Sequence, residues 1–302
     1  MAKIDTGADR SLREGRRIPY LLVLPALLFL FVFFITPLIS LFKTSLSTKP
    51  DRLKPKYDFT WEWGNYSQAF DRFGEHLLRS FIFAALATLL CIVIAYPVAY
   101  FIAFKVDKWR NVLLGLVMVP FFTSFLLRTL AWQSLLADQG PVLDFIRAIN
   151  LDGILETIGI LDEGRLLNTP LAVIGGLTYN FLPFMLLPIY VSLEKIDRRL
   201  VDAAADLYSP FRSTFRKVIL PLSLPGVFAG TLLTFIPATG DFINAHYLGG
   251  TDEQRVIGKA VQTQFLAEND YPSAAGMSFV LMAIITAIVM VYTKFMGTED
   301  LA

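Results

Sequence analysis

The sequence predicts an all-α, polytopic membrane protein with six transmembrane helices. Of its 302 residues, 55% are hydrophobic and only 18% are charged, and the mean hydropathy of +0.55 is typical of integral membrane proteins. Six long stretches are almost free of charged side chains. The basic residues gather in alternate loops between these stretches, as the positive-inside rule requires.

Each stretch is long enough to cross a hydrocarbon layer of about 30 Å at about 1.5 Å per helical residue. The first follows a polar N-terminal tail, residues 1–17, and is too long for a cleavable signal peptide. Pro97 is expected to kink the second span. The third is expected to continue to Leu136, with Arg128 reaching the outer interface by snorkelling. The predicted spans are residues 18–42, 80–104, 111–127, 171–193, 220–240 and 274–293.

Orientation follows from the Lys and Arg content of the loops. With the N-terminus inside, the inner segments hold 15 basic residues in 59 positions, against 12 in 111 for the outer segments. This predicts cytoplasmic termini and a cytoplasmic segment 194–219. Residues 140–149 and 151–160 are expected to form short helices in an outer loop. Trp61, Trp63, Tyr66 and Phe70 suit an aromatic belt at the lipid headgroups.

Several kinds of function find no support in the sequence. A net charge of +1 gives no electrostatic reason to bind nucleic acid. The single cysteine, Cys91, excludes an intramolecular disulfide, and His76 and His246 are too isolated to suggest a zinc site. There is no GxxxxGKS phosphate loop and no nucleophile elbow. We therefore expect no metal, no cofactor and no enzymatic activity in this chain, and any ATP site must lie on another chain.

A translocation path would be lined by the few polar and aromatic residues near the spans. Each candidate has an ordinary alternative. Because the chain has 26 phenylalanines, the alternative for the rings in the third span is plain packing against neighbouring side chains. Polar residues before Pro183 can satisfy backbone groups that the proline frees, and an acid after Gly240 can be plain helix-end polarity. The candidates are Phe121, Phe122, Tyr179, Asn180, Asp241 and Asn244.

The interval 194–219 is polar, lies between two apolar spans and predicts two short helices that meet at a corner. Ile196, Leu200, Ala203 and Leu207 fall on one helical face. The pattern breaks at residues 208–210, where Ser209 is expected to cap a second helix with Pro210 in its first position. The stripe of that helix is Phe211, Phe215 and Val218, ending at Leu220-Pro221. The alternative is a surface hairpin with no partner.

Part of this interval resembles the EAA signature of permease subunits of ABC importers. The resemblance rests on Asp202-Ala203-Ala204, Leu207, Thr214-Phe215, Val218, Leu220-Pro221 and Pro225-Gly226. In that family the segment is a cytoplasmic coupling helix that docks into a cleft of the ATPase. Tyr208 stands where the family has glycine, so either Ser209-Pro210 makes the bend or Tyr208 is a strained contact residue. The resemblance implies that the ATPase-coupling residues are Asp202, Ala203, Ala204, Leu207, Tyr208, Ser209, Arg212 and Phe215.

Residues 119–132, 176–197 and 235–250 further resemble the polyamine (spermidine/putrescine) branch of these permeases. The resemblance implies one type I permease domain over residues 18–302, in a bacterial inner membrane. It also implies two ATPase subunits, a second and usually different permease, and a solute-binding protein that delivers the substrate. Relatives that move iron, thiamine or anions share the coupling segment and remain alternatives.

Two other classes of protein compete with this interpretation. A stand-alone secondary carrier needs ionisable residues inside its spans, and such residues are scarce here. A membrane enzyme needs a cluster of acid, base or metal-binding groups, and the sequence offers only Asp241 and His246.

Overall fold

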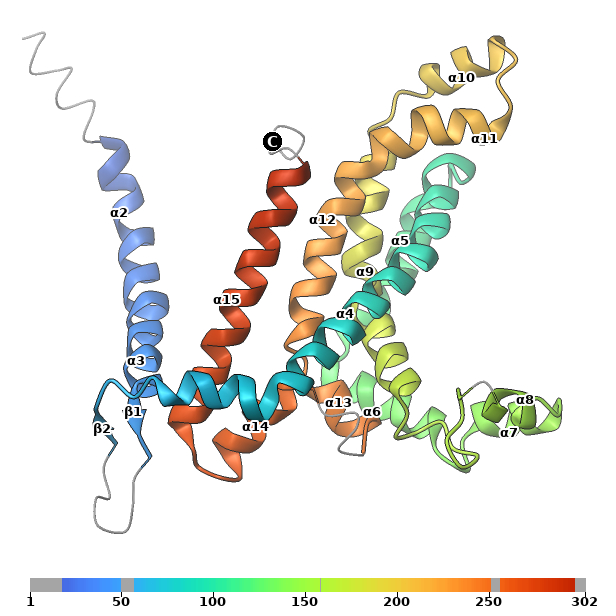
Figure 1. The fold of residues 1–302 in the computed structure, drawn as a ribbon. Coiled ribbons are helices and arrows are strands. Elements are labelled where there is room, and N and C mark those ends of the chain that lie inside the picture. The colour runs from blue at the N-terminus through green and yellow to red at the C-terminus, as the bar shows by residue number, and fades with distance from the viewer. Residues whose placement is uncertain (1–17, 50–56, 158, 251–255, 297–302) are drawn as a thin grey trace, which may run out of the picture.

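The computed structural model describes residues 18–49, 57–157, 159–250 and 256–296, so the predicted tail 1–17 lies outside the described residues. The described chain is almost entirely helical, as predicted (Figure 1). One small antiparallel ladder was not predicted: β1 (Ser47–Thr48) pairs with β2 (Asp58–Phe59) in the first loop.

Among the described residues, five helices are long and apolar enough to cross a membrane, and a bent pair adds a sixth span if it is counted as one. The first span joins α2 (Ile18–Leu30), a π-helical turn (Phe31–Ile35) and α3 (Thr36–Ser45). The second is α4 (Gly64–Lys105) and the fourth is α9 (Pro170–Glu194). The fifth is α12 (Leu220–Thr239) and the sixth is α15 (Tyr271–Met296). These five agree with the sequence prediction.

The third span is broken, and its predicted continuation to Leu136 as one helix is wrong. It comprises α5 (Arg110–Met118) and a 3-10 turn (Val119–Phe122), followed by α6 (Phe125–Leu136). The segment Arg110–Phe122 meets the segment Phe125–Ala148, which begins with α6, at an angle of 92°. Thr123 and Ser124 have extended backbones between the two parts, and the Thr123 hydroxyl donates to the Pro120 carbonyl at 2.6 Å. A proline followed by a side chain that bonds its carbonyl stops the helical ladder.

The second helix begins 16 residues before the predicted span. In Figure 1, α4 first runs beneath α15 and then rises through the molecule. Its early residue Asn65 is buried, and its side-chain amide donates to the carbonyls of Ser45 (2.9 Å) and Ser47 (3.0 Å). The charged stretch before residue 80 looks like a loop by hydropathy, but its apolar face, including Ala69, packs on α14 (Ile257–Leu266) and α15.

The core lies where α4, α9 and α12 pack together. Small side chains on α4, among them Cys91, Ala95 and Ala99, face Met185 and Ile189 of α9. Small residues let helix backbones approach closely. In lipid the hydrophobic effect does not drive helices together, so this close van der Waals packing stabilises the contact instead. By contrast α2 stands apart from this core, and the first span contacts α15 through α3 (Figure 1).

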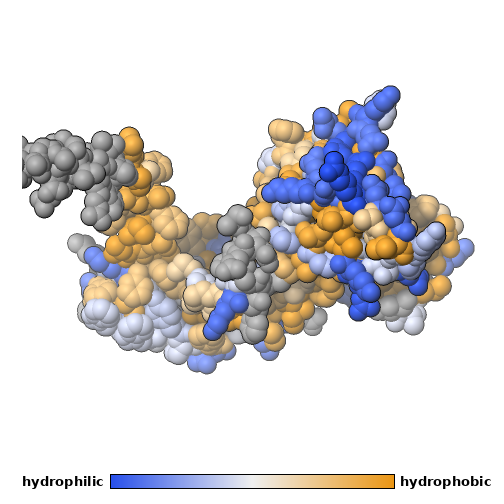
Figure 2. All heavy atoms as spheres, turned by 90° about the horizontal axis from the view of Figure 1, so that it is seen from above, coloured by the Kyte–Doolittle hydropathy of each residue, from blue (hydrophilic) through white to orange (hydrophobic). Residues whose placement is uncertain are grey.

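The two faces of the molecule differ. In Figure 1 the start of α2 and the end of α15 lie on the same side as α10 (Arg198–Asp206) and α11 (Phe211–Thr214). The opposite side carries the short helices α7 (Pro141–Ala148), α8 (Asp152–Thr157), α13 (Ile243–Leu248) and α14. Helices α7 and α8 confirm the two predicted short helices, whereas α13 and α14 were not predicted. Viewed from above, hydrophilic side chains gather over α10 and α11 (Figure 2).

Candidate functional site

Residues 195–219, which include α10 and α11, form an arm that projects from the core (Figure 1). Helix α10 is capped at its start by Asp197, whose Oδ1 accepts a hydrogen bond from the amide of Arg199 at 3.0 Å. The predicted face exists, but beyond the buried Ile196 it points outward: Leu200 is exposed, and Leu207 at the tip is 82% exposed. An apolar face without a cover in its own chain is suited to contact a partner.

The corner of the arm is built at Tyr208, which has a φ of +54° and is 96% exposed. The amide of Tyr208 donates to the carbonyl of Ala205 at 2.9 Å, and the amide of Ser209 donates to that of Ala204 at 3.0 Å. This pair of bonds is a Schellman motif, which ends a helix with one left-handed residue and usually places glycine there. Tyr208 therefore makes the bend in the conformation that glycine adopts, at a cost of about 1 kcal/mol.

The predicted cap of the second helix is wrong by one residue. The N-cap of α11 is Pro210, and its carbonyl accepts from the amides of Ser213 (2.9 Å) and Thr214 (3.1 Å). Ser209 instead closes the preceding Schellman motif, because its amide is used there. The predicted end at Leu220-Pro221 is also wrong: a π-helical turn (Phe215–Ile219) leads directly into α12. This wider turn accommodates the proline, which lacks an amide hydrogen.

The base of the arm is fixed to the core by aromatic packing and by two ion pairs that sequence reasoning missed. The ring of Phe215 packs edge-on against Tyr96 (centroids 5.7 Å apart) and Tyr100 (6.3 Å), so this predicted coupling residue faces α4. Arg110 bonds Glu194 at 2.7 Å, and Arg198 bonds Asp107 at 3.4 Å. Both arginines also donate to the carbonyl of Ala103 near the end of α4, so together they connect α4, α5, α9 and α10.

Three of the predicted path residues join one buried hydrogen-bonded network. The Nδ2 of Asn180 on α9 donates to Oδ1 of Asn244 on α13 at 3.0 Å and to the hydroxyl of Thr129 on α6 at 3.1 Å. Asn244 in turn donates to Oδ1 of Asp241 through its amide (2.8 Å) and its Nδ2 (3.1 Å). The side chain of Asn180 thus does not bond the backbone near Pro183. Thr129 was missed, because no sequence signal distinguishes it from other span threonines.

The carboxyl group of Asp241 is the ionisable member of this network. Burial raises its pKa from 3.8 to about 6, and the two hydrogen bonds from Asn244 oppose that rise. The side chain accepts the bond of the Asn244 amide at the start of α13, which is a helix-capping role. Asp241 therefore combines structural capping with a charge that changes near neutral pH.

Of the predicted path residues, Tyr179 lines a cavity of about 440 Å³ at the break of the third span. Tyr179 stacks on Trp132, with ring centroids 5.5 Å apart and planes inclined by 7°. Arg128 also lines this cavity. Its guanidinium carbon lies 4.1 Å from the centroid of the Phe121 ring and 5.7 Å from that of Phe125. Arg128 is only 9% exposed, so the predicted snorkelling to the outer interface is wrong.

The structure separates the two predicted phenylalanines. Phe121 lies under the Arg128 guanidinium and packs edge-on against Phe184, at 6.3 Å between centroids. Phe122 is 88% exposed and lies in neither the cavity nor the network. Trp132 was missed as a path candidate, although its place four residues after Arg128 on one helical face was a usable signal.

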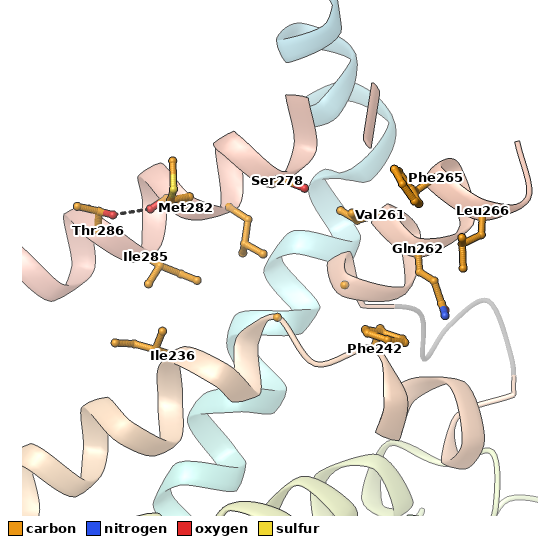
Figure 3. Close-up of a pocket in the computed structure, with 13 residues that line it drawn as sticks. Ile236, Phe242, Val261, Gln262, Phe265, Leu266, Ser278, Met282, Ile285 and Thr286 are labelled. Carbon is orange, nitrogen blue, oxygen red and sulfur yellow. Dashed lines mark hydrogen bonds between the residues drawn. The ribbon is translucent and has the colours of Figure 1, made fainter. Parts of the chain in front are cut away.

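A larger cavity of about 750 Å³ lies between α12, α14 and α15 (Figure 3). Its walls are mostly apolar, with Ile236, Phe242 and Ile285 pointing into the space, and none of its lining residues is charged. The Thr286 hydroxyl is used within its own helix, where it donates to the Met282 carbonyl at 2.7 Å. The cavity contains none of the predicted path residues and offers no group that selects a charged solute. Within the described ranges, no group of three or more His, Cys, Asp or Glu residues is placed to hold a metal ion.

Known proteins are similar to this chain over most of its length. The chain is 37% identical over 269 residues to the spermidine/putrescine transport system permease protein PotB of Salmonella typhimurium, covering 88% of this chain and 89% of the relative. It is 38% identical to PotB of Escherichia coli K12, covering 88% and 93%. The E. coli inner membrane ABC transporter permease protein YdcU is 32% identical, covering 74% and 72%.

The fold is similar to that of a chain in the crystal structure of a bacterial ABC transporter that imports the acidic polysaccharide alginate. The TM-score is 0.70 at 15% identity, over 95% of this chain and 98% of that chain. The same transporter in complex with an alginate pentasaccharide-bound periplasmic protein gives a TM-score of 0.66. Residues 95–297 match the family described as binding-protein-dependent transport system inner membrane component. With the arm, the spans and these relatives in agreement, the chain belongs to that family of inner membrane transport components.

Proposed function

We propose that this chain is a permease subunit of an ATP-driven importer for a polyamine such as spermidine or putrescine. The observation that carries the proposal is the identity of 37–38% to spermidine/putrescine permeases over 88% of the chain. An ATP-driven importer of this family receives its solute from a binding protein. Tight, selective binding by the spans themselves is therefore not required.

The chemistry of the candidate path supports a cationic solute. Amines bind to aromatic ring faces, where each cation–π contact contributes about 0.5 to 2 kcal/mol, and to carboxylates. The stacked pair of Trp132 and Tyr179 supplies the rings, and Asp241 supplies the carboxylate. The network through Asn180 and Asn244 connects the helices that carry both features.

The partners follow from the architecture of the family. We place the arm, and with it both ends of the chain, in the cytoplasm, where Leu207 and Tyr208 contact an ATPase subunit. Two ATPase subunits, a second permease of different sequence and an extracytoplasmic solute-binding protein complete the transporter. Closure of the ATPases on ATP levers the arm, and the ion pairs of Arg110 and Arg198 pass the movement to α4 and α9, which opens the path outward.

Uptake by vesicles that contain the complete transporter tests the substrate. We expect radiolabelled spermidine or putrescine to enter only with ATP inside, and Asp241→Asn to reduce uptake sharply. Asp138→Asn is the matched control, because it removes an exposed acid that lines neither cavity and belongs to no part of the Asn180 network. If neither amine enters while another solute stimulates ATP hydrolysis, the permease function stands and the polyamine proposal is wrong.

The double variant Asp202→Arg, Ala203→Trp tests the arm. Both positions are exposed on α10, so the spans are expected to fold normally. We expect the purified transporter to lose the stimulation of ATP hydrolysis by substrate-loaded binding protein. Normal stimulation in the double variant would remove these residues from the ATPase contact.

One observation favours a second candidate. Arg128 lines the cavity beside Tyr179, and a buried guanidinium suits an anionic solute better than a cationic one. An anion permease would accumulate a labelled carboxylate or oxyanion in the same vesicles, and Arg128→Gln would abolish that uptake.

A further inference from the structure

The guanidinium of Arg128 is buried without a complete set of partners. Its Nε and Nη1 have no hydrogen-bond acceptor, and within the described ranges no ion pair involves Arg128. The two nearby aromatic rings interact with the face of the cation, but they leave its N–H donors unused. A buried charge is ordinarily paired, so a cation in this state indicates that an anion is supplied from outside the chain.

The anion has a place to enter. Arg128, Thr123 and Tyr179 line the 440 Å³ cavity at the break of the third span. Helix α6, which carries Arg128, lies on the side of the molecule away from the arm (Figure 1). The Thr123 side chain is exposed, and Thr123 donates its hydroxyl to the Pro120 carbonyl. The rest of the lining is largely apolar, so an arriving carboxylate finds one strong, pre-positioned cationic partner there.

Charge decides which occupant fits. A polyamine carries only positive charges, so it is repelled by Arg128 and cannot supply the anion. This step rests on the proposed function. The remaining sources are an acidic side chain of another subunit and a lipid phosphate. Arg128 lines a cavity shared with the path residue Tyr179 and is 9% exposed, which favours a side chain that inserts from a facing subunit over a lipid headgroup.

We propose that Arg128 forms an ion pair with an Asp or Glu of the second permease subunit, across the cavity that Thr123 and Tyr179 line. The pair neutralises the buried guanidinium and joins the two permeases at the break of the third span. It also holds an acid of the partner at the candidate path, where a polyamine amine competes with Arg128 for the same carboxylate. Arg128 thus occupies the position of the substrate cation while the path is empty.

Site-directed photocrosslinking in the complete transporter tests the contact directly. Thr123→p-benzoylphenylalanine places the reactive group in the cavity and leaves Arg128 unchanged. We expect a crosslink to the second permease, with an Asp or Glu in or next to the crosslinked peptide. Adducts to lipid alone, or no adduct while the complex is intact, would overturn the proposal.

Charge exchange tests the pair itself. We expect Arg128→Glu to reduce uptake at least 10-fold, and the reciprocal change of the crosslinked acid to Arg to restore a substantial part of it, while Arg128→Lys retains more uptake than Arg128→Gln. Arg165→Glu is the matched control, because Arg165 is exposed and paired within its own chain, to Asp138. If the exchanged pair fails to rescue an assembled complex, the ion pair is wrong. Crosslinking remains informative if wild-type vesicles take up no polyamine, so failure of the two proposals can be told apart.

Discussion

Asn180 and Asn244 lie 64 residues apart in the sequence, and their fully buried side chains share a hydrogen bond of 3.0 Å between α9 and α13. This bond fixes the short helix α13 to the core at the point where Asp241 begins it. The arrangement makes the stability of this region depend on side-chain amides rather than on apolar packing alone.

Asn244→Ala is expected to destabilise the purified complex. It leaves the Nδ2 of Asn180 with a single partner, Thr129, and removes a donor to Asp241. Loss of a partner for a buried polar group costs about 1 to 3 kcal/mol. Thermal unfolding in detergent measures the change, and Ser134→Ala on α6 serves as control because its hydroxyl bond is exposed. Equal midpoints for the two variants would show that the network is not stabilising.

Uptake is expected to depend on pH through Asp241. With a pKa of about 6, the carboxyl group is charged well above that pH, so uptake should fall as the external pH drops through 6. Stability should change in the opposite direction. Because the pKa is raised on folding, the protonated form stabilises the folded protein fully below pH 3.8, and this contribution is lost as pH rises through 6.

The variant Asp241→Asn separates these two effects. It keeps an oxygen that can cap α13 but never ionises, so uptake should be low and independent of pH between 5 and 8 (about the range over which this group titrates). At about pH 8 the thermal midpoint should rise, corresponding to at most about 3 kcal/mol. An uptake profile that keeps its fall near pH 6 in this variant would assign the titration to another group.

Two substitutions of Tyr208 distinguish backbone strain from partner contact. Tyr208→Gly removes the ring and the left-handed strain, whereas Tyr208→Ala removes the ring and keeps the strain of about 1 kcal/mol. If the exposed ring is an anchor in the ATPase, both variants should weaken ATPase binding by about 2 kcal/mol or more. Binding of the ATPase to the permease pair measures this. If Tyr208→Gly binds the ATPase as well as the wild type does, Tyr208 only forms the bend and its ring does not contribute to ATPase binding.

Glu194→Gln is expected to weaken coupling with little effect on folding. The pair of Arg110 and Glu194 is partly exposed, so its loss should cost no more than about 1 kcal/mol. The same pair holds the end of α9, directly before the arm, to Arg110, which also bonds the end of α4, so substrate-stimulated ATP hydrolysis should fall several-fold. Asp138→Asn breaks an ion pair with Arg165, which involves neither the arm nor α4, and should leave stimulation unchanged. A large drop in thermal stability for Glu194→Gln would contradict the division between coupling and folding.

Gly226 is expected to tolerate no side chain. A Cβ at this position would lie 2.5 Å from the Ser192 hydroxyl oxygen and would also collide with the Pro188 carbonyl, both on α9. Gly226→Leu should therefore prevent close packing of α12 on α9 and reduce the yield of folded protein. Gly115→Ala is the control, since no atom lies within 4 Å of a Cβ there. Similar yields of both variants would exclude a packing role.

The spans and the arm could be predicted from sequence because both depend on local patterns. An uncharged run of sufficient length identifies a span wherever it packs, and the apolar spacing of α10 is visible within about three turns. The length of α4 could not be predicted, because residues 64–79 are charged and their helix is stabilised by contact with α14 and α15. The break after Pro120 was missed for a related reason: the extended backbone of Thr123 and Ser124 has no hydropathy signal.

The sequence identified most of the polar residues of the candidate site, but it did not predict which of them contact one another. Asn180, Asn244 and Asp241 were each recognisable as polar residues near spans, whereas their connection through Thr129 depends on the packing of three helices. Arg128 was misplaced because the snorkelling argument treats a span as isolated in lipid. Here the chain bends between Phe122 and Phe125, and the guanidinium of Arg128 lies over the Phe121 ring. Tyr208 was left open between two explanations, and the observed φ of +54° places it in the strained conformation.

Helix α4 runs from the side of the molecule that carries the arm to the opposite side (Figure 1). At about 1.5 Å per residue its 42 residues extend about 63 Å, roughly twice the thickness of the hydrocarbon layer. Near one end, the Ala103 carbonyl accepts hydrogen bonds from Arg110 and Arg198. Near the other end, the side chain of Asn65 donates hydrogen bonds to the backbone at the end of α3 and just after it. A displacement of the arm is therefore expected to reach the opposite face along one helix, which changes direction on the way but is not interrupted by a loop (Figure 1).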